Sequence, residues 1–173
     1  NWPYNWSEFC VYTPFTKEEL QAAVDLWVDD NATALELYGH INSWNVSFIT
    51  NMEDLFKEKT TFNDDINNWD VTAITNMSQA FSGGGRMHWF NEYINDWDVG
   101  NVTNMNYMFN YTHQFDQPLD KWDVGNVINM SNMFNGASNF SKNIGIWDVS
   151  NVENMSGMFA NTSFNQDITG WIV

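Results

Sequence analysis

An aspartate follows a tryptophan at a regular interval along the chain, and a row of carboxylates is a pattern that can bind a metal ion. The residues are Asp70, Asp98, Asp123 and Asp148, with Asn45 in the same place at the start of the row. If successive units stack about 5 Å apart, neighbouring carboxylates repel each other by roughly 1 kcal/mol. Ca²⁺ bridging carboxylates and carbonyl oxygens would offset this repulsion. Calcium is therefore the one cofactor that the sequence suggests.

A local turn is the alternative explanation for the aspartate row. Each carboxylate would then accept N–H bonds from the residues that follow it, as in an Asx turn. Asn45 suits this alternative, because an amide oxygen accepts the same bond. The sequence has no EF-hand and no glycine–aspartate nonapeptide of the RTX type. A thermal melt with EDTA distinguishes the two explanations, because only a bound cation makes the melt sensitive to chelation.

One segment carries residues that suit ligand binding and do not belong to any repeated pattern. Residues 82–90 read SGGGRMHWF, and their unit is three residues longer than its neighbours. The three glycines favour a flexible excursion. Arg86, His88 and Trp89 would then project from a loop, where Trp and Arg often dominate the binding of a partner. The alternative is a tolerated insertion whose tryptophan packs back onto the chain.

Residues for catalysis do not gather into a recognisable motif. The three histidines, His40, His88 and His113, fall in different units and lack metal-ligand spacing. There is no Gly-x-Ser-x-Gly, no phosphate loop and no Cys/His cluster. The single cysteine, Cys10, excludes an intrachain disulfide. We therefore expect a protein that is not an enzyme.

The charge of the chain restricts its partners. Lys and Arg number 6 against 22 Asp and Glu, which gives a formal net charge of -16. Such a surface repels phosphate backbones and anionic lipid, so we expect no nucleic acid partner. No apolar run approaches the length of about 20 residues that a membrane span needs, so we expect no direct membrane insertion. Cations, basic proteins and neutral sugars remain as partners.

The segments that position these residues repeat along the chain. Tryptophan recurs mostly 25 residues apart, with one interval of 28 and a last one of 24, at Trp44, Trp69, Trp97, Trp122, Trp147 and Trp171. An Asn-Met pair follows at a constant offset, with its asparagines at Asn51, Asn76, Asn104, Asn129 and Asn154. A fixed period of this length indicates a solenoid, in which stacked units bury a continuous apolar face. We expect the asparagines inside, bonded to loop backbone.

Each unit can be divided into a strand and a short helix. Trp97 and Val99 lie two residues apart and would share one face of a strand. Met105, Met108 and Phe109 have the spacing of one helical face. The pattern predicts an α/β repeat solenoid, a right-handed leucine-rich-repeat-like coil with short parallel strands and short helices.

The N-terminal region differs from the repeats and resembles a helical cap. Thr16 and Glu19 have the spacing of a capping box. The apolar residues that follow lie on one helical face, which would cover the first coil: Leu20, Ala23, Val24 and Trp27. We therefore expect an N-terminal helical cap over residues 1–40 and a solenoid of about five 25-residue repeats over residues 41–173.

The segments FNQDITGWIV and WDVSNVENMSGMFANTSFNQDI, with their copies, resemble the bacterial surface protein 26-residue repeat family. That family is also called the domain of unknown function 285 and is grouped with BspA-like leucine-rich repeats. The resemblance covers roughly residues 41–173, and the segment before it resembles the opening of such arrays in marine protists and algae. It implies a secreted or cell-surface location, adhesion or partner binding, and no enzyme activity. The 28-residue unit and the ending at Val173 depart from the family pattern.

Asparagines in glycosylation sequons add a test of secretion. Several sequons are part of the repeat sequence, and the asparagines at Asn76, Asn129 and Asn154 are expected to be buried in the interior. Better candidates fall in predicted loops: Asn5, Asn31, Asn110, Asn139 and Asn161.

These patterns together predict a non-catalytic extracellular or cell-surface recognition or adhesion module that binds a protein or a glycan. One alternative is a structural subunit that self-associates through the solenoid ends in a surface filament or wall layer. Another is a lectin-like module that binds carbohydrate through exposed aromatic residues.

Overall fold

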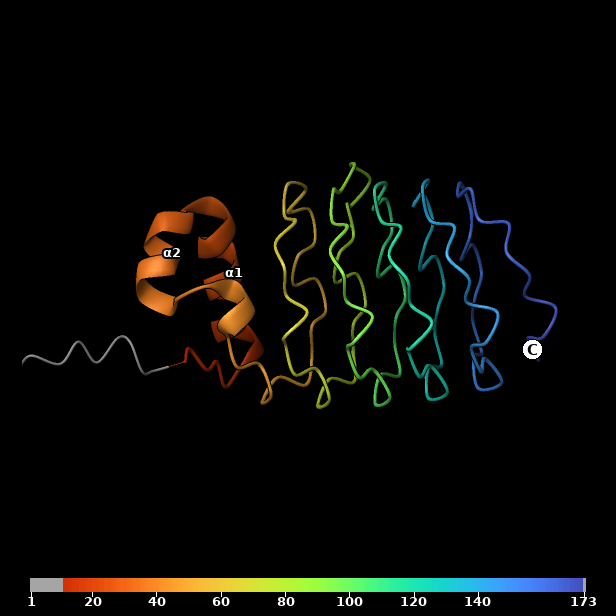
Figure 1. Ribbon diagram of the computed structural model, residues 1–173, viewed down its shortest axis with the longest axis horizontal. Coiled ribbons are helices and arrows are strands. Elements are labelled where there is room, and N and C mark those ends of the chain that lie inside the picture. The colour runs from red at the N-terminus through yellow and green to blue at the C-terminus, as the bar shows by residue number, and fades with distance from the viewer. Residues whose placement is uncertain (1–10, 173) are drawn as a thin grey trace, which may run out of the picture.

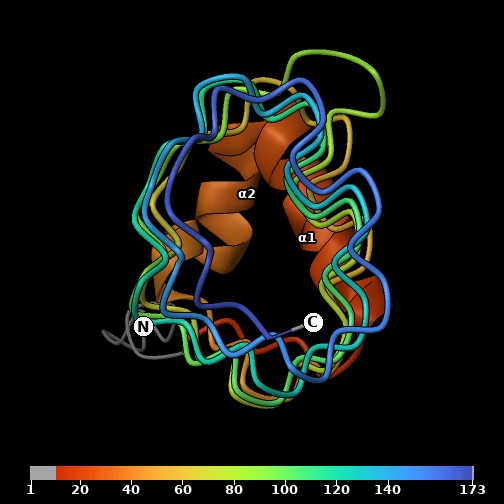
Figure 2. The same ribbon diagram turned by 90° about the vertical axis from the view of Figure 1, so that its right-hand side faces the viewer.

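The computed structural model describes residues 11–172, and its helices lie together at one end of that range. They are α1 (Lys17–Asp29), α2 (Asn31–Tyr38) and a single 3-10 turn, η2 (Ile41–Ser43). The rest of the chain winds through successive coils that stack along the long axis, with α1 and α2 at one end (Figure 1). Viewed along that axis, the coils follow nearly the same outline (Figure 2).

The prediction of an α/β leucine-rich-repeat-like solenoid is wrong. No strand, sheet or α-helix forms in the repeats within residues 11–172, where η2 is a single 3-10 turn at the start of the first unit. Each unit therefore lacks both its expected strand and its expected short helix. The β-type pairing there consists of isolated parallel bridges between neighbouring coils: Asn51–Asn76, Asn76–Asn104, Asn104–Asn129 and Asn129–Asn154. The repeats are therefore coils of turns and loops.

An alternating hydrogen-bond pattern explains why the repeats form neither helix nor strand. The Tyr107 N–H donates to the Ser131 carbonyl of the next coil at 2.9 Å. The following N–H, of Met108, instead closes a turn onto the carbonyl of Met105 at 3.2 Å. An α-helix would need each N–H to bond four residues back. Every second N–H of the segment bonds to a carbonyl of the next coil, and the N–H groups between them close tight turns within their own coil.

Two rows of left-handed positions, the first with a member in five coils and the second in four of them, impose this path. The first row consists of Asp54, Gln79, Tyr107, Asn132 and Gly157, with φ between 54° and 66°. The second consists of Glu58, Tyr111, Gly136 and Asn161, with φ between 57° and 74°. Positive φ is incompatible with both a right-handed helix and a strand. The helical spacing of Met105, Met108 and Phe109 therefore reflects their shared burial rather than a helix.

The apolar side chains that recur in each repeat fill the interior, as predicted. The Phe109 ring stacks on Phe81 and Phe134, each with a ring-centroid distance of 5.6 Å, and on Phe115 at 4.0 Å. The repeat tryptophans from Trp44 to Trp147 are also buried. The indole N–H of each repeat tryptophan from Trp69 to Trp171 donates to an Ile or Leu carbonyl of the preceding coil, and Trp89, which is not a repeat tryptophan, is outside this row. The repeated sequence is therefore the core.

Helix α1 begins with the capping box that the sequence predicts. The Thr16 side chain accepts from the Glu19 N–H at 3.1 Å, and the Glu19 carboxylate accepts from the Thr16 N–H at 3.3 Å. The buried face of the helix consists of the expected residues, Leu20, Ala23, Val24 and Trp27. None of the helices within the described range is long and apolar enough to cross a bilayer.

Polar contacts join α1 to the first coil. Gln21 Nε2 donates to the Leu55 carbonyl at 3.0 Å. In later coils the equivalent carbonyl accepts a backbone N–H from the preceding coil, so the Gln21 side chain takes the place of that N–H. Lys59 Nζ lies 2.6 Å from Asp25 Oδ1. Helix α1 therefore supplies both apolar surface and hydrogen bonds to the first coil.

Candidate functional site

The segment 82–90 leaves the common outline of the coils as a protruding loop (Figure 2). It is closed at both ends by bonds to the next coil: Gly83 N–H donates to the Asn110 carbonyl at 2.7 Å, and His88 N–H to the Tyr111 carbonyl at 3.0 Å. A turn joins the Arg86 N–H to the Gly83 carbonyl at 2.9 Å. The three extra residues are thus accommodated outside the stack without a shift of the coils on either side.

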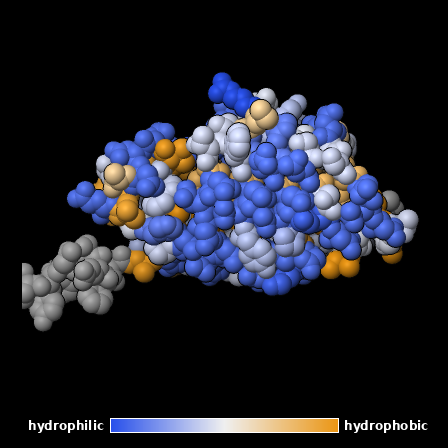
Figure 3. Space-filling model, turned by 45° about the horizontal axis from the view of Figure 1, so that its top comes forward, coloured by the Kyte–Doolittle hydropathy of each residue, from blue (hydrophilic) through white to orange (hydrophobic). Residues whose placement is uncertain are grey.

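The segment exposes apolar surface beside a cation, from Met87 in the loop and from Trp89 just after it, where the Trp89 N–H donates to the Thr60 carbonyl at 3.0 Å. Met87 is 60% exposed and Trp89 is 56% exposed. The other tryptophans within residues 11–172 are buried or partly buried. Arg86 is exposed and forms no ion pair or side-chain hydrogen bond with another described residue. Four of the lysines, Lys57, Lys59, Lys121 and Lys142, are paired, and the half-buried Lys17 is not. The space-filling view shows a mainly hydrophilic surface over the coils (Figure 3). A partner could therefore contact a Trp, a Met and an unpaired Arg together.

The third residue expected at this site, His88, is buried and does not share its surface. Nε2 lies 3.1 Å from the Phe56 carbonyl, and Nδ1 accepts from the Phe90 N–H at 3.2 Å. A neutral ring with its proton on Nε2 satisfies both contacts. Burial lowers the pKa of His88 to about 4. Thr112 makes the equivalent contact one coil later, to the Phe81 carbonyl at 2.8 Å. His88 therefore supports the loop from within.

The predicted aspartate row is present on the exposed surface, and each member forms a local turn. Oδ1 of Asp70, Asp98, Asp123 and Asp148 accepts the N–H two residues on at 3.0–3.1 Å. Asn45 accepts from the Ser47 N–H in the same way at 3.2 Å. Within residues 11–172, no three His, Cys, Asp or Glu side chains lie together in a group that could hold a metal ion. The geometry favours the Asx turn over calcium as the reason for the row.

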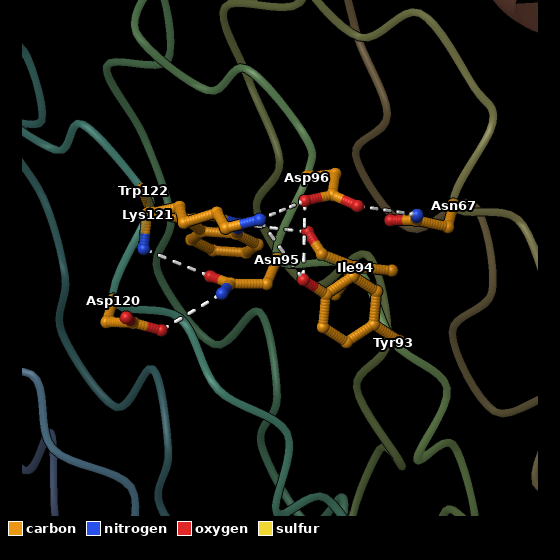
Figure 4. Close-up of polar contacts among 8 residues, drawn as sticks. All are labelled: Asn67, Tyr93, Ile94, Asn95, Asp96, Asp120, Lys121 and Trp122. Atoms are coloured by element: carbon orange, nitrogen blue, oxygen red, sulfur yellow. Dashed lines mark hydrogen bonds and ion pairs between the residues drawn. The ribbon is translucent and has the colours of Figure 1, made fainter.

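A second polar cluster links three successive coils (Figure 4). Lys121 Nζ lies 2.6 Å from Asp96 Oδ1, and Asn67 Nδ2 donates to Asp96 Oδ2 at 3.2 Å. Hydrogen bonds, that from Lys121 first, lower the pKa of Asp96, and the same pair raises the pKa of Lys121. Tyr93 OH also donates to Asp96 at 3.3 Å. Because these groups are solvent-exposed and satisfy one another, the cluster orders the surface but contributes little to stability.

The chain matches the family described as "Mycoplasma protein of unknown function, DUF285" twice, over residues 29–120 and 85–173. It belongs to this family. The two matches overlap over residues 85–120 and together reach from the end of α1 to the end of the chain. No curated protein and no solved structure matches this DUF285 chain. The family description assigns no activity, so any function must be argued from the surface.

The predicted glycosylation sites of this DUF285 chain differ in accessibility. Asn31, Asn139 and Asn161 are exposed. The prediction of a loop is wrong for Asn31, which is the first residue of α2 and donates from Nδ2 to the Trp27 carbonyl at 3.5 Å. Asn110 is buried, and its amide donates to the Asn135 carbonyl at 3.2 Å, which makes it a poor acceptor for a glycan. Asn5 lies outside the described residues.

Replacing one aspartate of the row tests whether it serves a turn or a metal. We expect Asp123→Asn to leave the thermal midpoint unchanged, because Asn45 already forms the same turn. Asp123→Ala loses the bond to Gly125 N–H and should lower the midpoint by about 2–4 °C, the shift for roughly 1 kcal/mol in a chain of this size. Melts with CaCl₂ and with EDTA complete the measurement. An EDTA-sensitive midpoint that Asp123→Asn abolishes would show a calcium site instead.

Proposed function

We propose that this DUF285 chain is a non-catalytic recognition or adhesion module whose protruding loop binds a protein or glycan partner on a cell surface. The observation that carries the proposal is the exposure of Trp89 and Met87 beside the unpaired Arg86. Trp and Arg are the residues most often found at binding hot spots, and Met adapts to irregular partner surfaces.

The charge distribution also supports the protruding loop as the binding surface. The chain carries a formal net charge of -16, so most of its surface repels acidic partners. Arg86 is the cation that is both exposed and unpaired among the described residues, since the other unpaired cation, Lys17, is half-buried. A partner that offers a carboxylate or a polar edge to Arg86 and an apolar patch to Trp89 would fit this loop.

The proposed location is secreted or at the cell surface. It rests on the narrower resemblance to BspA-like surface proteins and to marine protist or algal members of the family. It is tested by mass spectrometry of the native protein, because N-linked glycan on the exposed Asn139 or Asn161 requires passage through a secretory pathway.

The alternative of a structural subunit that stacks end to end is less well supported. Gln21 and the buried face of α1 cover the first coil, so an intact second copy would meet a helix there rather than an open coil. Size-exclusion chromatography and electron microscopy test this alternative, which requires concentration-dependent assembly.

We expect Trp89→Ala to weaken partner binding by about thirtyfold or more, the effect of losing a hot spot worth about 2 kcal/mol. The binding would be measured on a glycan array and by cross-linking to cell surfaces, each with the wild type alongside. The thermal midpoint should stay nearly constant, since exposed substitutions change stability by at most about 0.5 kcal/mol.

Ile146→Ala is the matched control, because Ile146 is 72% exposed and lies in another coil. Equal losses in both variants, or no loss in Trp89→Ala, would overturn the assignment to this loop.

A further inference from the structure

A cavity of about 340 Å³ lies between the helical end and the first coils, away from the protruding loop. Trp27 and Phe62, both almost fully buried, contribute aromatic edges to its wall. Val28 and Leu35 add aliphatic surface from α1 and α2. Its volume is at the lower end of the range for small-molecule sites. The cavity therefore has room for one small ligand with an apolar face.

Four polar residues line the cavity, and each has a side-chain atom that forms no hydrogen bond with another described residue. Asp64 Oδ2 accepts from Trp27 Nε1 at 3.0 Å, which fixes the carboxylate and leaves Oδ1 without a partner. His40 Nδ1 accepts from the Asn42 N–H at 3.3 Å, so the neutral ring carries its proton on Nε2. The Asn31 Oδ1 and the Thr61 hydroxyl also lack partners among residues 11–172. The wall thus offers acceptors and donors together.

The electrostatics of the cavity exclude an anionic ligand. Asp64 is its one carboxylate, and no Lys or Arg lines it. The last turn of α1, which contributes Trp27 and Val28, adds the negative end of a helix dipole. A primary amine would pair with Asp64 but leave the His40 Nε2–H without an acceptor. A hydroxyl both donates and accepts, so it satisfies both groups.

We propose that this cavity binds a small neutral polyol, such as a single sugar residue, with hydroxyls on Asp64, His40 and Asn31 and its C–H face against Trp27 and Phe62. The site is independent of the protruding loop. It gives the chain a second, small-ligand binding function that does not depend on the partner proposed for Trp89.

The test is an NMR titration of ¹⁵N-labelled protein with methyl glycosides of glucose, galactose and mannose, plus glucosamine and glucuronic acid. The readout is the Trp27 indole N–H, because its bond to Asp64 makes it sensitive to an occupant. At least one neutral glycoside should shift this signal in a saturable way, and glucuronic acid should not. No saturable shift with any neutral glycoside would overturn the proposal, and tighter binding of glucosamine would overturn the assignment to a neutral ligand.

Three variants locate the binding. Asp64→Asn keeps an acceptor for Trp27 but removes the charge, and should weaken the glycoside by about tenfold, because charge-assisted hydrogen bonds are roughly twice as strong as neutral ones. Leu35→Trp should abolish binding by filling the cavity, and Leu35 is exposed enough for the protein to fold. Asp70→Asn, a carboxylate outside the cavity, is the control and should bind as the wild type does. Unchanged binding in both Asp64→Asn and Leu35→Trp would place the glycoside elsewhere, and neither result bears on the Trp89 surface.

Discussion

Replacing Phe109 with alanine should lower the free energy of unfolding by about 3–5 kcal/mol and the thermal midpoint by roughly 10 °C. Phe109 is fully buried in the middle of the stack. Its ring stacks on Phe81 of the preceding coil and Phe134 of the following one, and also on Phe115. The backbone on both sides is held by bonds between coils, so the surrounding rings cannot collapse fully into the cavity. The variant therefore loses burial and leaves a void.

Urea unfolding followed by tryptophan fluorescence measures the effect. Ile128→Ala is the matched control, because Ile128 is 45% exposed and its loss should change stability by less than about 0.5 kcal/mol. A loss below about 1 kcal/mol for Phe109→Ala would contradict the continuous aromatic core.

The second large effect is a loss of stability on acidification that depends on His88. In the folded protein, burial lowers the pKa of His88 from its ordinary value of 6.5 to about 4. Below pH 6.5 the unfolded chain takes up a proton that the folded one does not, so stability falls with pH and the loss is complete near pH 4. A difference of this size corresponds to about 3 kcal/mol. Protonation would also place a hydrogen on Nδ1, which accepts from Phe90 N–H.

The measurement compares urea unfolding at pH 7 and pH 4 in the wild type and in His88→Gln. Glutamine keeps a donor for the Phe56 carbonyl but does not titrate, so its stability should fall by about 3 kcal/mol less over this interval. Carboxylates with lowered pKa, such as Asp96 and Asp148, titrate in both proteins and cancel in the comparison. An independent NMR titration of the His88 ring should give a pKa far below 6.5. A ring that titrates near 6.5 would refute the buried neutral state.

The repeat spacing was sufficient to predict the interior but not the backbone path. Trp97, Val99, Met105 and Phe109 are all buried, because a side chain that recurs at each unit must either line the core or cover the surface of a stack. The capping box of α1 was also predictable, since it depends on adjacent residues alone. The expected helix was not correct, because the left-handed conformation of Tyr107 has no signature in that residue type.

Side-chain burial in the irregular unit was equally hard to predict. Trp89 and His88 are neighbours in a glycine-rich segment, and nothing in the letters shows that one is exposed while the other is buried. One sequence signal could have predicted that His88 is buried. His88 lies two residues before Phe90, close to the position of Thr112 before Phe115, and both side chains contact a Phe carbonyl of the preceding coil. The cavity beside Asp64 was not predictable either, because it joins α1, α2 and the first coils, whose packing no local pattern specifies.

The bond from the Gly83 N–H to the Asn110 carbonyl belongs to a ladder that recurs between neighbouring coils, and the bond from the His88 N–H to the Tyr111 carbonyl fixes the other end of the loop. Residues 84–87 therefore form no part of the hydrogen bonding between coils that aligns the stack. The molecule combines a regular stack of coils with one loop that could be replaced, as antibody domains do with their hypervariable loops. Peptides of other lengths and sequences grafted between Gly83 and His88 should be displayed on a folded scaffold beside Trp89, which the graft leaves in place, so the contacts around Trp89 could be changed without a change of fold.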